Sequence, residues 1–188
     1  MKKVFIGLVL MSFVVIGVVF YFKMINKNYV SPEENLEVTS EAFENGKKLP
    51  VQYTGFGEDI SPNLIFRNIQ SDGKYIAIIM DDLDTPIGRL NHWVIWNIPV
   101  KYKSIPSGIE KKSIVESLDG ASQGKNSYGS KNYYRGPKPP AGIHRYVFQV
   151  YVLDEKLSID ENSRKKDLQR AMKGHIIQYG TIEGTFEN

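Results

Sequence analysis

The pattern of apolar and polar residues in the central part of the chain predicts two buried strands joined by a polar loop. Tyr75–Met80 is an apolar run rich in Ile, and Trp93–Ile98 is a second such run, which stops at Pro99. Short apolar runs bounded by breaking residues are typical of strands rather than helices. The polar residues between the runs are Asp81, Asp82, Asp84, Arg89 and His92. Such a loop suits a functional site, although Asp and Pro are also ordinary turn residues.

A third long strand is predicted after a stiff segment rich in Gly and Pro. This segment, Gly136–Gly142, leads directly into an apolar run that begins at His144. Alternate side chains of a strand share a face, so His144, Tyr146 and Phe148 should lie on one side of the sheet.

A histidine also opens the second central strand. His92 stands just after the polar loop, and strand alternation predicts that it shares a face with Val94 and Trp96. The chain contains three His, and two of them, His92 and His144, hold equivalent positions at the start of a strand. This equivalence favours a shared site over two unrelated turns.

The apolar spacing becomes helical near the end of the chain. The residues at this spacing are Leu168, Ala171, Met172, His175, Ile176 and Tyr179. They predict an amphipathic helix that stops at Gly180, after which Thr181–Phe186 could return as a short strand. The whole pattern predicts many strands and one late helix.

The first residues form a separate, strongly apolar segment. Residues 4–22 carry no charge, and Ser12 is their one polar side chain. This length is enough to cross a bilayer as a helix. A cleaved signal peptide is the competing interpretation, but its apolar core is normally shorter and ends at a small-x-small site, which is missing near Tyr21–Met24. The sequence therefore predicts an N-terminal transmembrane helix.

This prediction divides the chain into three parts. Residues 1–25 would be the membrane anchor, residues 26–37 a polar tether, and residues 38–188 one domain with one core. Short N-terminal tails usually stay inside, so we expect a single-pass protein whose domain is extracytoplasmic. The alternative is secretion after signal cleavage.

The charge balance excludes one class of partner. The chain has 24 Lys and Arg against 21 Asp and Glu. Residues 1–23 hold three lysines and no acid, so residues 24–188 carry 21 charges of each sign and are formally neutral. Nucleic-acid binding depends on neutralising phosphates with Lys and Arg, so we expect no nucleic-acid partner. The absence of Cys rules out disulfides and thiolate chemistry.

Five motifs follow one another along the chain: GEDISPNLIF at 57–66, DDLDTP at 81–86, HWVIWNIP at 92–99, YRGPKPPAGIHRYVFQVYVLD at 134–154 and AMKGHIIQYGTIEGTF at 171–186. These motifs and their order resemble the phosphatidylethanolamine-binding protein family, most closely its bacterial and archaeal branch of Raf-kinase-inhibitor-like proteins. The resemblance covers residues 38–186. Together the motifs are far more specific than any single motif. The resemblance implies an antiparallel β-sandwich with flanking helices, and the strand pattern agrees.

The resemblance also implies a small pocket that accepts a phosphate or a phosphoryl head group. Its residues in this chain would be Asp82, Asp84, Pro86, His92, Tyr134, Gly136, Pro137, His144 and Tyr146. A His ring can donate hydrogen bonds to an anion, and an acid on its other nitrogen fixes the tautomer. Asp82 or Asp84 could be that acid, and Tyr134 could add a hydroxyl donor. Backbone N–H groups of the Gly136–Gly142 segment could approach the ligand. Lys138 departs from the branch, which commonly has Cys there.

Two other kinds of site use the same residues. A hydrolase could combine the His and Asp residues with hydroxyls of Ser127, Ser130 and Tyr134, but the G-x-S-x-G nucleophile motif is missing. A zinc site is also conceivable, but no His-x-His or HExxH spacing supports it. We expect no metal, no cofactor and no catalytic residue.

The sequence thus favours a membrane-tethered binding protein for phosphate, phosphorylated ligands or phospholipid head groups. A hydrolase-type enzyme that uses the same His and Asp residues remains the alternative. The resemblance implies that a kinase or a protease could be a protein partner.

Overall fold

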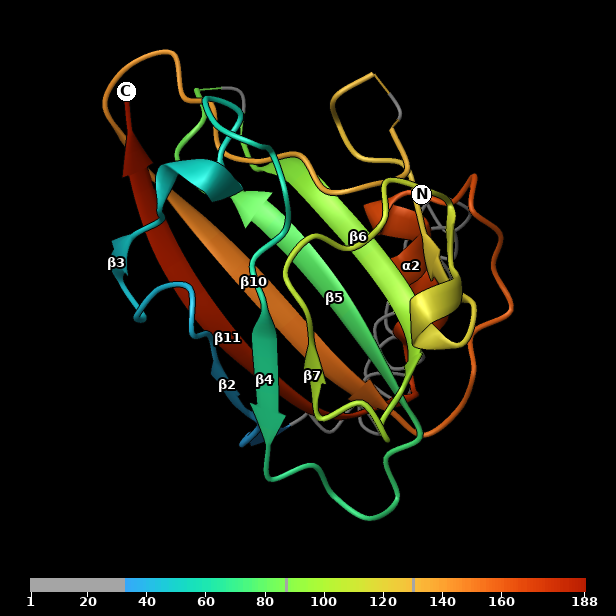
Figure 1. Cartoon of the computed structure of the whole chain (residues 1–188). Helices are drawn as coiled ribbons and strands as arrows, with labels where there is room; N and C mark the ends of the chain where they lie inside the picture. Colours follow the sequence, from blue (N-terminus) through green and yellow to red (C-terminus); the bar gives the residue numbers. More distant parts are fainter. Residues whose placement is uncertain (1–32, 87, 130) are drawn as a thin grey trace, which may run out of the picture. The chain divides into compact units, whose positions relative to one another are not determined.

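The computed structural model describes residues 33–86, 88–129 and 131–188, and its fold is mainly β (Figure 1). The strands are β1 (Glu33–Glu34), β2 (Glu37–Thr39), β3 (Lys47–Lys48), β4 (Leu64–Arg67), β5 (Tyr75–Asp82), β6 (Leu90–Pro99), β7 (Ser104–Ile105), β8 (Ile114–Val115), β9 (Ala121–Gln123), β10 (Ile143–Leu153) and β11 (Ile176–Glu187). The helices in these ranges are α2 (Lys165–Met172) and the short 3₁₀ helices η1 (Val51–Tyr53) and η2 (Glu116–Leu118).

The described strands form two sheets. The large sheet has the order β1-β11-β10-β5-β6-β9-β8, with β3 also paired to β11, and the small sheet has the order β2-β4-β7. Most neighbouring strands are antiparallel, whereas β1 and β3 run parallel to β11. The small sheet lies across one face of the large sheet (Figure 1). This arrangement is the sandwich that the family resemblance implies.

The main core fills the space between the two sheets. Ile76, Ile78 and Met80 of β5 pack there with Leu64 and Phe66 of β4, all of them buried. Burying each such side chain contributes roughly 1.5–3 kcal/mol. This face of the large sheet, which we call the sandwich face, also carries the candidate site.

The opposite face of the large sheet is covered by α2, and we call it the helix face. Ala77 and Ile79 of β5 pack there against Leu168 and Met172 of α2. The central strands are therefore buried on both faces, which explains why Tyr75–Met80 is apolar without alternation.

Helix α2 is shorter than the apolar spacing predicts. It ends at Met172, and the chain from Ile176 onward belongs to β11 instead of a continued helix. Gly174 has a φ of 89°, a conformation that interrupts an α-helix and that glycine adopts without steric penalty. The prediction of a helix as far as Tyr179 is therefore wrong.

The predicted membrane helix, residues 4–22, lies outside the described residues. Among the residues that are described, no helix is long and apolar enough to cross a membrane. Helix α2 has eight residues, which at 1.5 Å per residue span about 12 Å of a core that is about 30 Å thick. The predicted fold class is corrected accordingly: it is mainly β with one C-terminal helix. The expected localisation, a single-pass membrane anchor, is corrected with it.

The start of the described chain overlaps the predicted tether. Glu33–Glu34 forms β1 at the edge of the large sheet, and β2 begins at Glu37. Residues 26–32, the remainder of the predicted tether, lie outside the described residues. The boundaries of the three parts, at residues 25 and 37, stay a prediction.

Candidate functional site

The candidate site lies where one end of β5 meets the beginnings of β6 and β10. In the large sheet β5 is the neighbour of both strands, and Asp82 is the register partner of Tyr146 on one side and of Leu90 on the other. Residues far apart in the sequence therefore share one edge of the sandwich. The two histidines that the sequence singled out both stand at this edge.

His144 and Asp82 form the centre of the site. His144 Nδ1 lies 2.8 Å from Asp82 Oδ2, and both residues are buried. The other oxygen of Asp82 accepts the backbone N–H of Asp84 at 2.9 Å. A carboxylate can only accept, so Nδ1 carries a proton. Among the described residues nothing bonds to His144 Nε2, which is therefore free for a ligand.

Tyr146 lies beside this pair with an unused hydroxyl. Its ring stacks on His144 with the centroids 6.4 Å apart. The hydroxyl is buried and has no hydrogen-bond partner among the described residues. Burial, the nearby charge of Asp82 and a side-chain interaction with that carboxylate raise the pKa of Tyr146 well above its usual value, so the hydroxyl keeps its proton. Asp82 is the nearby acceptor, but no described group accepts from the hydroxyl with full hydrogen-bond geometry.

His92 reaches the site through a β-bulge in β6. Asn91 is paired with Asp81 and Trp93 with Met80, which leaves His92 as an extra residue without a partner on β5. A bulge of this kind re-aims a side chain. The His92 ring accordingly meets Tyr146 on the sandwich face, with the ring centroids 5.3 Å apart.

The prediction that His92 shares a face with Val94 and Trp96 is therefore wrong. Those two side chains belong to the core beneath α2, on the helix face. Strand alternation assumes an unbroken ladder. The bulge at His92 shifts the alternation by one residue.

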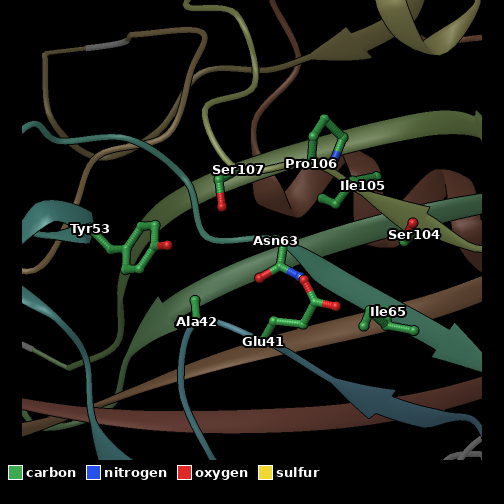
Figure 2. Close-up of a pocket in the computed structure, with 9 residues that line it drawn as sticks. All are labelled: Glu41, Ala42, Tyr53, Asn63, Ile65, Ser104, Ile105, Pro106 and Ser107. Atoms are coloured by element: carbon green, nitrogen blue, oxygen red, sulfur yellow. The ribbon is translucent and has the colours of Figure 1, made fainter.

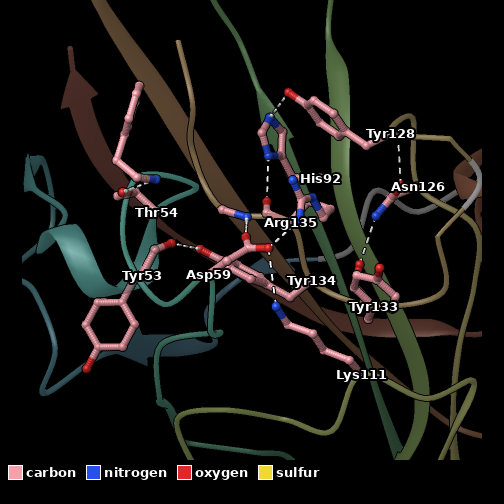
Figure 3. Close-up of polar contacts among 12 residues, drawn as sticks. Tyr53, Thr54, Asp59, His92, Lys111, Asn126, Tyr128, Tyr133, Tyr134 and Arg135 are labelled. Carbon is pink, nitrogen blue, oxygen red and sulfur yellow. Dashed lines mark hydrogen bonds and ion pairs between the residues drawn. The ribbon is translucent and has the colours of Figure 1, made fainter.

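The His92 ring is held in one tautomer. Nδ1 donates to the carbonyl oxygen of Arg135 at 2.7 Å, because a carbonyl can only accept. Nε2 then accepts the hydroxyl of Tyr128 at 3.1 Å (Figure 3). Burial lowers the pKa of His92, although the bond to the Arg135 carbonyl opposes this effect. Burial and the charge of Asp82 raise the pKa of Tyr128 to about 12. Both groups are neutral at neutral pH.

The lowered pKa of His92 predicts that mild acid destabilises the fold. In the unfolded chain a His takes up a proton near pH 6.5, whereas folded His92 takes it up only at lower pH. The contribution is complete above about pH 6.5 and is lost as the pH falls below that value. Urea unfolding at about pH 5.5 should therefore give a lower midpoint than at about pH 7.5. The decrease should be smaller in His92→Gln, and an equal decrease in both proteins would assign the effect to other groups.

Asp59 bonds to residues beside the site, although no role was predicted for it from the sequence. It is 8% exposed, and its carboxylate accepts the N–H of Gly136 at 2.6 Å. It also pairs with Arg135 and, at 3.3 Å, with Lys111 (Figure 3). Asp59 lies inside the motif at 57–66, which was the one feature of the sequence that could have identified it. Tyr128 lies in a long polar segment, and no feature of the sequence pointed to it.

The Gly/Pro segment beside the site is fixed by hydrogen bonds of Tyr134, Gly136 and Pro137. The buried hydroxyl of Tyr134 donates to the carbonyl of Tyr53 at 2.7 Å, so its proton is already in use. The Gly136 N–H is taken by Asp59, and the carbonyl of Pro137 accepts the N–H of Gly55 at 2.8 Å. These three residues fasten the Gly/Pro segment to the loop around Tyr53.

The remaining predicted residues lie at the edge of the site or outside it. Asp84 pairs with Arg145 through two side-chain bonds of 2.9 and 2.7 Å, and this hydrogen bonding lowers the pKa of Asp84. The acid that meets a histidine is thus Asp82. Pro86 is exposed in a tight turn, and Lys138 is exposed with its ammonium 5.3 Å from the centroid of Phe56.

Two of the hydroxyls considered for a hydrolase are already engaged. Tyr134 donates to Tyr53, and Ser127 Oγ accepts the N–H of Asn91 at 3.2 Å. Ser130 lies outside the described residues. Within the described ranges no group of three or more His, Asp or Glu side chains could hold a metal ion.

A separate hollow of about 380 Å³ lies beside the small sheet (Figure 2). It contains none of the predicted site residues. Tyr53 contributes to its lining, together with the hydroxyls of Ser104 and Ser107. Glu41 is the one charged residue of that lining, and a carboxylate repels an anion. The histidine cluster also holds a carboxylate, Asp82, but that carboxylate is paired with His144, whereas the lining of the hollow contains no Lys, Arg or His. Anion chemistry therefore fits the histidine cluster better.

Comparison with protein families and curated sequences finds clear relatives. The family model described as phosphatidylethanolamine-binding protein matches residues 39–187. The UPF0098 protein of Pyrococcus abyssi is 41% identical over 157 residues, which cover 82% of this chain and 86% of that protein. The UPF0098 protein of Pyrococcus horikoshii is 40% identical over 158 residues, covering 82% and 79%.

Two solved structures share the fold. A phosphatidylethanolamine-binding protein homolog from Chlamydia trachomatis, CT736, superposes with a TM-score of 0.73 at 32% identity. YbcL of E. coli, described as a new member of the mammalian PEBP family, gives a TM-score of 0.75 at 26% identity. Each match covers 83% of this chain and 99% of the other one.

Proposed function

We propose that this chain, which belongs to the phosphatidylethanolamine-binding protein family, binds a small phosphoryl anion through His144 and Tyr146, with the His92 ring packed beside Tyr146. The ligand would be inorganic phosphate, a phosphorylated small molecule or a phospholipid head group, which share the same phosphoryl chemistry. One observation carries the proposal: the Tyr146 hydroxyl is buried without a partner among the described residues.

A buried hydroxyl without a hydrogen-bond partner destabilises the fold by about 1–3 kcal/mol. A hydrogen bond from this hydroxyl to a phosphoryl oxygen of the ligand would remove that cost. His144 stands two residues away on the same face of β10 and stacks on the Tyr146 ring. The two side chains can therefore approach one anion together.

His144 would contribute a proton as well as a hydrogen bond. The Nδ1 proton of His144 is used in the hydrogen bond to Asp82. Nε2 can therefore donate to a ligand only when both ring nitrogens carry a proton. Binding an anion would then draw a proton onto His144, while Asp82 balances the added positive charge. Asp82 thus acts on the ring and does not touch the ligand.

The surrounding cations offset the repulsion that the Asp82 carboxylate would exert on an anion. Arg135 and Lys111 share the single carboxylate of Asp59, so these three groups together carry one net positive charge. A positive charge near the site attracts negative ligands. A protein partner that carries a phosphoryl group, for which the family resemblance suggests a kinase or a protease, could present that group to the same side chains.

The variant Tyr146→Phe should weaken phosphate binding without weakening the fold. A hydrogen bond to a charged ligand contributes about 1.5–3 kcal/mol, so the affinity should fall tenfold or more. The free energy of unfolding should stay level or rise, because the variant removes an unpaired polar group. Calorimetric titration of the full chain with inorganic phosphate, phosphoethanolamine and glycerol phosphate measures the affinities, and urea unfolding measures the stability.

The control is His175→Ala. His175 pairs with Asp154 at 3.0 Å and Glu155 at 3.3 Å, on residues that take no part in the site. This variant should bind as the wild type does, whereas His144→Ala should bind more weakly. Equal affinity in the wild type and in folded Tyr146→Phe and His144→Ala would refute the proposal. The three ligands separate recognition of free phosphate from recognition of a head group.

A further inference from the structure

The helix face of the large sheet carries a polar cluster directly behind the candidate site. Asp81, Asn91, Gln149 and Lys165 form it, and we call it the back-face cluster. Asp81 follows Met80 and precedes Asp82, so its side chain points away from the site. It is fully buried, accepts from Gln149 Nε2 at 3.1 Å and pairs with Lys165 of α2.

Asn91 connects this cluster to the bulge. Its Nδ2 donates to the carbonyl of Met80 at 3.0 Å, to the carbonyl of Trp93 at 3.1 Å and to Asp81 Oδ1 at 3.1 Å. All three partners can only accept, so the orientation of the amide is unambiguous. Met80 and Trp93 are the register partners at the edge of the bulge. One side chain therefore ties both strands together next to His92.

The amide of Asn91 also destabilises the fold. Asn91 Oδ1 is buried and has no hydrogen-bond partner among the described residues. An unsatisfied buried acceptor destabilises by about 1–3 kcal/mol, which an aliphatic side chain would avoid. The Nδ2 contacts across the bulge offer a physical reason for Asn at this position.

The bulge decides which face His92 occupies. In an unbroken ladder residue 92 would share the helix face with Val94 and Trp96. It would then lie under α2, away from Tyr128 and Tyr146. A residue that stabilises the bulge therefore controls whether His92 belongs to the site.

We propose that Asn91 is the positioning residue of His92: its amide holds the bulge, Asp81 fixes the amide, and Lys165 anchors Asp81 to α2. Asn91 acts from the far face and touches no ligand. The orientation of the His92 ring follows from this geometry alone, whereas the effect on phosphate affinity rests on the proposed function.

The test compares Asn91→Ala with Gln149→Ala in the full chain. Gln149→Ala also removes a hydrogen bond to Asp81 but none across the bulge, so it is the matched control. Nitrogen NMR shifts of the His92 ring report its tautomer and pKa, and proton contacts report whether the ring meets Tyr146. Titration with inorganic phosphate is the second measurement.

In Asn91→Ala we expect the ring to lose its contact with Tyr146 and its fixed Nδ1–H tautomer, and phosphate affinity to fall roughly tenfold. Gln149→Ala should keep the wild-type ring and affinity. Asn91→Ser, which keeps a short hydroxyl donor, should change the ring in the same direction and serves if Asn91→Ala does not fold.

A wild-type ring state in both Asn91 variants would overturn the positioning role, even if phosphate still binds. If the His92 ring state changes in the Asn91 variants but the wild type binds no phosphate, the positioning role is upheld and the proposed function is refuted. Loss of the ring state in Gln149→Ala as well would assign the effect to the cluster in general and overturn the specific role of Asn91.

Discussion

Replacing Asp59 by Asn is expected to lower the free energy of unfolding by about 1.5–3 kcal/mol, because its largely buried carboxylate accepts charge-assisted hydrogen bonds from two partly exposed cations. The Asp59 carboxylate is shared by Arg135, Lys111 and the N–H of Gly136. Asn keeps the shape of the side chain and tolerates the φ of 58° found at Asp59. The loss would therefore report the charge itself. Urea unfolding at neutral pH measures it.

The change should also reach His92. Arg135 accepts from His92 Nδ1 and returns its own N–H to the carbonyl of His92 at 3.2 Å. Loosening Arg135 should therefore alter the His92 ring signals. The control is Asp72→Asn, an exposed turn residue with no described ion pair, which should stay within about 0.5 kcal/mol of the wild type. If Asp59→Asn and Asp72→Asn unfold at the same urea concentration, the charge of Asp59 does not contribute to the free energy of unfolding.

Replacing Gly136 by Ala should cost about 3 kcal/mol or more, since it forces an extra carbon into a filled space. A Cβ at Gly136 would lie 2.5 Å from the carbonyl oxygen of Tyr53 and 2.7 Å from Thr54. These are backbone atoms that cannot move aside cheaply. The shift would also strain the bond between the Gly136 N–H and Asp59. Thermal or urea unfolding of the variant measures the loss.

Gly55→Ala is the matched control for Gly136→Ala. Gly55 lies on the other side of the same contact, and its Cβ would lie 3.1 Å from Cβ and 3.2 Å from Cδ of Lys138, with no backbone atom among its three nearest neighbours. These contacts are tight but longer than those at Gly136, so we expect a smaller loss, of about 1 kcal/mol. Similar losses in both variants would mean that the close approach at Gly136 is not what matters.

The central strands and the family were predictable from the sequence for a simple physical reason. Tyr75–Met80 and Trp93–Ile98 are buried on both faces, so their apolar runs are unbroken, and the family assignment is confirmed by the match over residues 39–187. The end of α2 was not predictable from spacing, because His175, Ile176 and Tyr179 fit both a helical repeat and a strand. The positive φ of Gly174 decides between them.

Candidate residues for the site could be named from the sequence, but their contacts could not be predicted. The sequence left open whether Asp82 or Asp84 meets a histidine ring, and in the structure Asp82 Oδ2 lies 2.8 Å from His144 Nδ1. It also suggested that the Tyr134 hydroxyl meets the ligand, whereas that hydroxyl donates to Tyr53. Which partner a polar group finds depends on the packing of distant loops, and a bulge such as that at His92 leaves no mark in the apolar pattern.

The parallel pair of β1 and β11 has a consequence for how the chain acquires its structure. Glu33 is the register partner of Gln178, so this pairing closes a loop of nearly the whole described chain. Contacts between residues so distant in sequence slow folding, and sandwiches dominated by them typically fold in milliseconds to seconds. The β5–β6 hairpin can form early, since its strands are neighbours in sequence. During synthesis on the ribosome, Asp82 is made before its partner His144, and β1 before its partner β11, so the candidate site is completed among the last features of the fold.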